Sequence, residues 1–196
     1  QHSQAFESYY ANIPGLKVVM PSNPRDAKGL LKSAIRDDNP VVFIESELLY
    51  NAKGEVPEGE YLLPVGKAEI KREGTDLTLI GWSKSAPTNL AAAEALEKRG
   101  ISAEVIDLMT IRPLDEETVL RSVQKTNRVL VVQEAWPQAS VGAWVASLIS
   151  EKAFDYLDAP VLVHSGLDYP FPYAKNLEPF MVPTVETIVA HAERLF

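Results

Sequence analysis

The chain has 196 residues, of which 46% are hydrophobic and 23% charged, so it can bury a sizeable core and is not a disordered or fibrous chain. Its 27 acidic and 19 basic residues give a net charge of -8, which argues against nucleic acid or an anionic membrane as a partner. The absence of cysteine excludes disulfides, thiolate metal sites and cysteine nucleophiles. No apolar run approaches the roughly 18 residues of a membrane span, so we expect a soluble protein.

The sequence begins at Gln1 without an initiator methionine, and its first methionine is Met20. A strand-like segment follows after very little chain. We therefore expect the sequence to be a piece of a longer protein.

The first 50 residues predict one strand-helix-strand unit. Strands are expected at residues 16–20 and 41–44, and an apolar stripe at helical spacing predicts a helix over residues 24–35. Asn23 can cap this helix, and Asp26 lies in its first turn, where the helix dipole favours an acid.

Residues 51–65 are rich in glycine, proline and glutamate, which predicts a linker. Beyond the linker, short β-rich runs alternate with helical runs, as in a mostly parallel sheet covered by helices. The predicted strands are residues 77–82, 103–108, 128–133 and 161–163, and the predicted helices are residues 87–99, 115–124, 141–152 and 184–195. The expected fold is therefore α/β, with the end of one domain in residues 1–50 and a complete second domain in residues 66–196.

The three histidines are the first candidates for catalysis, because no G-x-S-x-G elbow or glycine-rich phosphate loop occurs. His191 lies on the last predicted helix and is most simply a solvated residue. His164 ends a strand at a place where ligands can bind, although capping or packing explains it as well. His2 has polar neighbours on both sides and could act as an acid, a base or a hydrogen-bond donor, or it could belong to a frayed terminus.

The end of the first predicted helix is a candidate cation site. Free carbonyls at a helix C-terminus, together with the oxygens of Asp37 and Asn39, make a plausible nest for a hard cation. The ordinary alternative is a polar helix stop closed by Pro40.

A series of short motifs resembles the β subunits of thiamine-diphosphate-dependent 2-oxoacid dehydrogenases. The motifs run in one order along essentially the whole chain, which makes the resemblance specific. Residues 136–138 and 173–175 are more similar to the pyruvate enzyme than to the branched-chain enzyme. The matching segments are residues 1–4, 14–19, 26–30, 33–37, 39–42, 110–115, 125–127, 134–138, 157–160 and 170–175.

The resemblance implies a fold and an activity. Residues 1–50 would end the domain that binds the pyrimidine of thiamine diphosphate, and residues 66–196 would form a transketolase C-terminal-like domain. The implied enzyme is an α2β2 assembly that decarboxylates pyruvate oxidatively and passes the acetyl group to the lipoyl group of a dihydrolipoyl acyltransferase. The α subunit would hold the diphosphate and magnesium. The alternatives are a branched-chain 2-oxoacid dehydrogenase or, for this piece alone, a non-catalytic dimerisation and docking module.

The resemblance also implies site residues. His2 matches the active-site histidine of the β subunit. Ala34, Ile35, Asp37 and Asn39 match a turn that holds potassium in mitochondrial-type relatives, and a further ligand would precede Gln1. The implied compartment is the bacterial cytoplasm or the mitochondrial matrix.

Asp158 matches the position where the acyltransferase's subunit-binding domain docks. Between Glu151 and Asp168 the sequence has four acids and one base, so this stretch could steer a basic partner, although it could equally be a solvated surface.

Two departures limit the resemblance. The glutamate that binds the cofactor in the family would precede Gln1, so the segment that touches thiamine diphosphate is absent from this sequence. In addition, Met109 stands where the family usually has arginine.

Overall fold

A five-stranded sheet lies at the centre of the larger part of the molecule. The structure, a computed structural model, describes residues 3–196. The strand order is β3-β5-β4-β7-β8, and all strands are parallel except β3, which runs antiparallel to β5 at one edge. The strands are β3 (Glu69–Arg72), β4 (Leu77–Gly81), β5 (Ala103–Asp107), β7 (Val129–Val132) and β8 (Leu162–His164).

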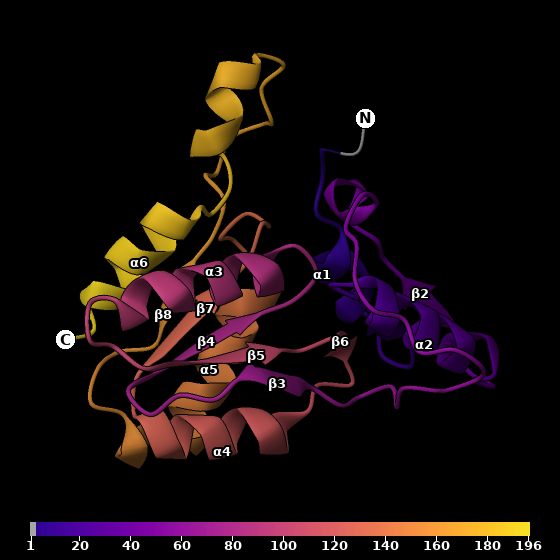
Figure 1. The fold of residues 1–196 in the computed structure, drawn as a ribbon, viewed down its shortest axis with the longest axis horizontal. Coiled ribbons are helices and arrows are strands. Elements are labelled where there is room, and N and C mark those ends of the chain that lie inside the picture. The colour runs from indigo at the N-terminus through magenta and orange to yellow at the C-terminus, as the bar shows by residue number, and fades with distance from the viewer. Residues whose placement is uncertain (1–2) are drawn as a thin grey trace.

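Helices cover both faces of this sheet and give a three-layer arrangement (Figure 1). Helices α3 (Ser85–Glu97) and α6 (Val185–Glu193) pack on one face, and α4 (Glu116–Thr126) and α5 (Val141–Lys152) on the other. Because successive strand residues point to opposite faces, β4 contributes to both cores. Leu79 joins the cluster under α3 and α6, whereas Ile80 joins the cluster over α4 and α5.

The first part of the chain forms a smaller three-stranded sheet beside the larger one. Strand β1 (Lys17–Val19) pairs in parallel with β2 (Val41–Phe43), and α2 (Pro24–Ile35) connects them. On its other edge β1 pairs antiparallel with β6 (Thr110–Arg112), which follows β5 of the larger sheet. One sheet therefore contains strands from both parts of the chain.

Helix α2 begins as its sequence predicts. The Asn23 side chain accepts a hydrogen bond from the Asp26 backbone N–H at 2.9 Å, which caps the first turn. The short helix α1 (Glu7–Ala11) and the 3-10 turn η1 (Glu47–Leu49) complete this part of the molecule.

Residues 51–65 contain no helix or strand, but they pack on α2. The Ser33 hydroxyl donates to the Leu63 carbonyl at 2.5 Å, and the Tyr61 hydroxyl donates to the Arg25 carbonyl at 2.6 Å. A Cβ on Gly29 would lie 2.7 Å from Leu63, so glycine is needed for this close approach. The predicted linker therefore packs against α2 along part of its length.

A buried ionic cluster joins α2 to the larger sheet. Asp26 and Asp107 have no exposed surface, and the Lys71 ammonium lies 2.7 Å from Asp26, 2.6 Å from Glu69 and 4.0 Å from Asp107. The Ser22 hydroxyl donates to Asp107 at 2.5 Å. The cluster thus connects α2 and the loop before it with β3 and β5.

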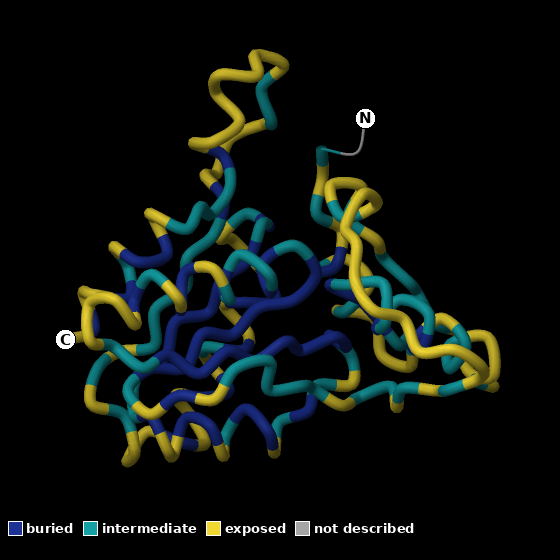
Figure 2. The backbone as a smooth tube through the Cα atoms, in the orientation of Figure 1, coloured by how far each residue is buried: buried dark blue, intermediate teal, exposed yellow. Residues whose placement is uncertain are grey.

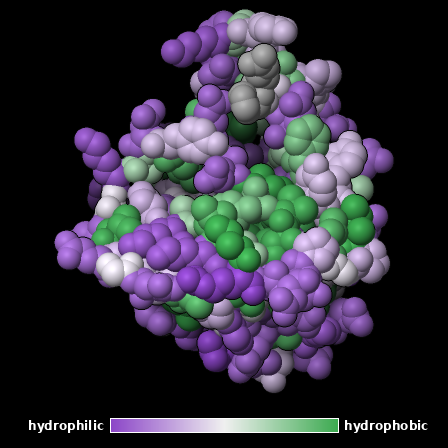
Figure 3. Space-filling model, turned by 90° about the vertical axis from the view of Figure 1, so that its right-hand side faces the viewer, coloured by the Kyte–Doolittle hydropathy of each residue, from purple (hydrophilic) through white to green (hydrophobic). Residues whose placement is uncertain are grey.

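Two surface features are prominent outside the sheets. Residues 165–183, which we call the projecting arm, extend away from the body between β8 and α6 and are mostly exposed (Figures 1 and 2). The face formed by the first part of the chain has a broad apolar patch (Figure 3). The exposed apolar side chains of this part include Ile13, Leu31, Ile35 and Leu48.

Within residues 3–196, no helix is both long and apolar enough to cross a lipid bilayer.

Candidate functional site

A cavity lies at the carboxyl edge of the larger sheet, between the loops that follow β4 and β7. The strand order reverses between these two neighbours, since the chain leaves β4 toward β5 and later returns to the other side of β4 as β7. Open α/β sheets bind ligands at this kind of switch point. The cavity has a volume of about 220 Å³. It is lined by Leu48, Lys84, Ser85, Thr88, Glu134, Val182, Pro183 and Thr184.

Four separate segments build the walls of this cavity. Lys84, Ser85 and Thr88 belong to the start of α3, and Glu134 follows β7. Leu48 comes from η1 in the first part of the chain, and the base of the projecting arm closes the remaining side. The site is therefore formed where both parts of the chain meet.

Glu134 is the group in the cavity best suited to proton transfer. Burial raises the pKa of its carboxyl to about 7, although Lys84 opposes this rise, and nearby Glu7 adds to it. A carboxyl with a pKa near neutrality can both accept and release a proton at cellular pH.

Glu7 is a second buried acid beside the site. Only 2% of the residue is exposed, and burial raises the pKa of its carboxyl. One carboxyl oxygen accepts a hydrogen bond from the Trp82 indole at 3.3 Å, and the other has no hydrogen-bond partner. This contact attaches α1 to the carboxyl end of β4.

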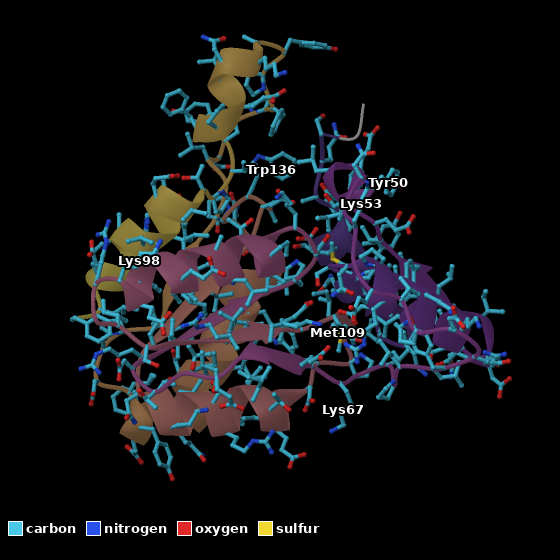
Figure 4. All side chains as sticks on the ribbon, viewed as in Figure 1. Tyr50, Lys53, Lys67, Lys98, Met109 and Trp136 are labelled. Carbon is cyan, nitrogen blue, oxygen red and sulfur yellow. The ribbon has the colours of Figure 1, made fainter. Side chains whose placement is uncertain are left out.

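The loop after β7 is fixed by a network around Gln133, which is fully buried. The Gln133 amide accepts from the Gly142 N–H at 2.7 Å and donates to the Ser165 hydroxyl at 2.9 Å. The Trp136 indole donates to the Tyr169 carbonyl at 3.0 Å, and Trp136 lies beside the projecting arm in Figure 4. These bonds hold the arm against the loop that carries Glu134.

His2, the predicted catalytic histidine, lies outside the described residues. Its role stays a prediction.

The predicted cation turn follows α2 at its C-terminus. Asp37 forms an ion pair with the Lys17 ammonium and accepts from the Asn39 backbone at 2.9 Å and the Asn39 amide at 3.0 Å. Its hydrogen bond with Lys17, followed by those from Asn39, lowers the pKa of the Asp37 carboxyl to about 2, so the group is ionised at neutral pH. The Ala34 carbonyl accepts from Arg36 and Asp37. The turn offers several oxygen atoms, as a hard cation requires. However, the Lys17 ammonium already contacts the Asp37 carboxylate.

Asp158, the predicted docking residue, is exposed and follows the 3-10 turn η2 (Phe154–Tyr156). Its carboxylate lies 3.3 Å from the Arg128 guanidinium, which partly offsets its charge. Phe154 and Tyr156 are also exposed, so acidic and aromatic side chains share this surface.

The other two histidines contact one another. The rings of His164 and His191 are stacked, with centroids 4.0 Å apart and planes inclined by 14°. His191 is partly exposed, so the expectation of a solvated residue holds only in part. Its stacking on His164 was not predicted, because β8 and α6 are distant in sequence. The packing alternative for His164 is confirmed.

Met109, which the resemblance places where the family usually has arginine, lies at the junction of the two parts (Figure 4). It is buried against Val19 and Leu30. Its φ of 53° is strained for a residue with a side chain, but its N–H donates to Asp107 and its carbonyl accepts from Met20. An apolar contact thus occupies the position where a charge was expected.

Glu134, Lys84 and Glu7 had not been singled out from the sequence as site residues. Glu134 and Lys84 directly follow predicted strands, and that position was the available signal. The sequence did not show that β4 and β7 are neighbours in the sheet, because the strand order depends on tertiary pairing.

Two family models match the chain. The model described as transketolase, C-terminal domain matches residues 66–188, and the model described as transketolase, pyrimidine binding domain matches residues 1–53.

Curated relatives match along the whole chain. It is 52% identical over 199 residues to the mitochondrial pyruvate dehydrogenase E1 component subunit beta of Dictyostelium discoideum, covering 100% of this chain and 56% of the relative. It is 52% identical over 190 residues to the E1 component subunit beta of Rhizobium meliloti, covering 96% of this chain and 41% of the relative. The chain thus spans about half the length of the curated relatives it matches.

A solved structure agrees in fold. A structure titled as a split gene transketolase, inactive beta4 tetramer, superposes with a TM-score of 0.79 over 96% of this chain and 59% of that chain, at 23% identity. This similarity supports the α/β fold. The chain belongs to the transketolase C-terminal domain family, and over its whole length it is homologous to the β subunits of the pyruvate dehydrogenase E1 component.

Proposed function

We propose that the chain forms the C-terminal part of a pyruvate dehydrogenase E1 β subunit, which acts in the oxidative decarboxylation of pyruvate and transfers the acetyl group to a lipoyl group. The observation that supports this most is the identity of about 50% to E1 β subunits along the entire chain. We propose residues 1–50 as the end of the pyrimidine-binding domain, 51–65 as a packed connection and 66–196 as the C-terminal domain.

Thiamine diphosphate would supply the electron sink for decarboxylation. Within residues 3–196, no group of three or more His, Cys, Asp or Glu side chains is placed to hold a metal ion, so these residues do not by themselves fit magnesium. We assign the diphosphate and magnesium to an α subunit in an α2β2 assembly. In this division of labour the chain supplies His2 as a proton or hydrogen-bond donor, and Glu134 holds a proton in the neighbouring cavity.

Reconstitution tests this function. We expect an assembly that contains this chain within its β subunit, together with an α subunit, thiamine diphosphate and magnesium, to oxidise pyruvate much faster than a branched 2-oxo acid. The chain alone should be inactive. A preference for the branched acid would favour the branched-chain alternative, and turnover by the chain alone would refute the division of labour.

We propose that the turn at Ala34, Ile35, Asp37 and Asn39 binds potassium, with the Lys17 ammonium moving away from Asp37. Binding to the folded state alone raises stability by about 2.7 kcal/mol when the ion is at 100 times its dissociation constant. We therefore expect a higher melting temperature in potassium than in sodium at matched ionic strength, and a loss of the difference in Asp37→Ala. Equal melting temperatures in the two salts would contradict the site.

We propose that Asp158 and the exposed Phe154 and Tyr156 dock the subunit-binding domain of a dihydrolipoyl acyltransferase. Asp158→Ala should weaken binding of this basic domain severalfold, mainly by slowing association at low salt, because exposed charges act by steering. Surface plasmon resonance at 50 and 300 mM salt measures the effect. Glu58→Ala, which removes an exposed acid elsewhere, is the control. Binding that is independent of salt and of Asp158 would rule out this surface.

The compartment follows the relatives, whose names include mitochondrial and bacterial forms. We propose the bacterial cytoplasm or the mitochondrial matrix as the location of the assembled enzyme.

A further inference from the structure

His164 and His191 belong to the two elements that flank the projecting arm. His164 is the last residue of β8, directly before the arm, and His191 lies in the last turn of α6, the helix that follows the arm. Their stacked rings therefore join the strand before the arm to the helix after it. Val182 and Pro183 of the arm, with Thr184 directly after them, line the cavity that contains Glu134.

Hydrogen bonds to Thr187 place one proton on a defined nitrogen of each ring. A carbonyl can only accept, so the bond of 2.8 Å between His191 Nδ1 and the Thr187 carbonyl requires a proton on Nδ1. The Thr187 hydroxyl donates to the Thr184 carbonyl, so it accepts from His164 Nε2 at 2.8 Å. Any further proton must therefore add to His164 Nδ1 or to His191 Nε2.

The surroundings of His164 oppose a charge on its ring. Burial, and then the neighbouring His191, lower the pKa of the His164 imidazole to about 4. One protonated ring can stack on a neutral ring, but two protonated rings 4.0 Å apart repel each other.

Within residues 3–196, no charged side chain forms a hydrogen bond or an ion pair with either ring. On α3, which packs on α6, Glu97 is paired with Arg72. Strand β7 places Val132 opposite His164, and α5 packs Gly142 against Val163. On α6, Glu186 lies in the first turn beside Thr184, and Glu193 is paired with Arg99. The charge that acts on His164 thus comes from His191.

We propose that His164 and His191 form a pH-sensitive clasp, which holds α6 against β8 near neutral pH and loosens this contact when His164 is protonated. Because the arm base lines the cavity, loosening the clasp would also open the candidate site.

The direction of the pH effect follows from the neutral state of His164. The pKa of His164 is about 4 in the closed form and rises toward its ordinary value of 6.5 when the ring is exposed. As pH falls from about 6.5 toward 4, the open form therefore binds more protons, and the closed form loses stability relative to it. We therefore expect the equilibrium constant for the opening of α6 to increase about tenfold when the pH is lowered from 7 to 5.

Hydrogen exchange of the whole chain, corrected for the intrinsic effect of pH, tests the clasp. Amides of α6 should lose about tenfold in protection between pH 7 and pH 5, while amides of β4 in the sheet centre change less than twofold. His164→Phe keeps an aromatic ring but removes the titration, so its α6 should show no such loss. Thr187→Val is the matched control, because it should loosen α6 at both pH values and leave the pH dependence in place.

Two results would overturn the proposal. One is that the α6 amides of His164→Phe lose as much protection between pH 7 and pH 5 as those of the unaltered chain. The other is cooperative acid unfolding of the whole chain at the same pH in both proteins, with no earlier opening of α6.

Discussion

Lys71→Ala is expected to lower the free energy of unfolding by about 3–5 kcal/mol, because it removes the central cation from a buried cluster. Burial opposes the charge on Lys71, but hydrogen bonds with Asp26 and Glu69 more than compensate and raise its pKa. Without the ammonium, buried Asp26 loses its ion pair with Lys71. Burial already raises the pKa of Asp107 to about 7, and the loss of Lys71, which opposes this rise, would raise it further. Urea unfolding followed by circular dichroism measures the change.

The matched control is Arg36→Ala. Arg36 pairs with Glu60 at the surface, where an ion pair contributes at most about 1 kcal/mol. A loss below 1 kcal/mol in Lys71→Ala would show that the cluster contributes no more than this surface pair.

His2→Ala should slow acetyl transfer by the assembled enzyme about 100-fold or more, since a positioned acid or base typically contributes 10²–10⁴ to a rate. The affinity for thiamine diphosphate should change little, because the cofactor ligands are proposed to lie elsewhere. Transfer to a free lipoyl domain under single-turnover conditions measures the step directly.

His2→Gln separates the two roles of the imidazole. Glutamine can donate a hydrogen bond but cannot transfer a proton near neutral pH. Recovery of the rate in this variant would assign hydrogen-bond donation, and a rate as slow as that of His2→Ala would assign proton transfer. An unchanged rate in His2→Ala would remove His2 from the mechanism.

Local sequence signals predicted most of the regular structure. The Asn23 cap, the apolar stripe of α2 and the Thr184 cap of α6 all appear where the sequence places them. The helix predicted at residues 115–124 runs from Glu116 to Thr126 with Asp115 as its cap. Such signals depend on neighbours within one turn, so one sequence is enough to read them.

Elements that depend on distant partners were missed. Strand β3 contains Glu69, Lys71 and Arg72, which look like surface residues until the pairing with β5 and the ionic cluster are known. Strand β6 has three residues and exists because β1 pairs with it. The linker prediction likewise overlooked the apolar Leu63, which packs on α2.

The candidate site was predictable only in part. Strand ends indicated where a ligand could bind, and the resemblance supplied His2, the cation turn and Asp158. Glu134 gains its raised pKa from burial between β7, α3 and the arm, and no local sequence pattern encodes burial of that kind.

The pairing of β6 with β1 limits how this family can recombine. The two regions that family models recognise separately are joined across one sheet, so their boundary in sequence is not a boundary in space. A chimera that joins residues 1–53 of this chain to a relative's C-terminal domain must preserve the register of Val18 with Arg112 and of Val19 with Thr110. A chimera of two relatives should therefore fold only when β1 and the short strand β6 come from the same protein.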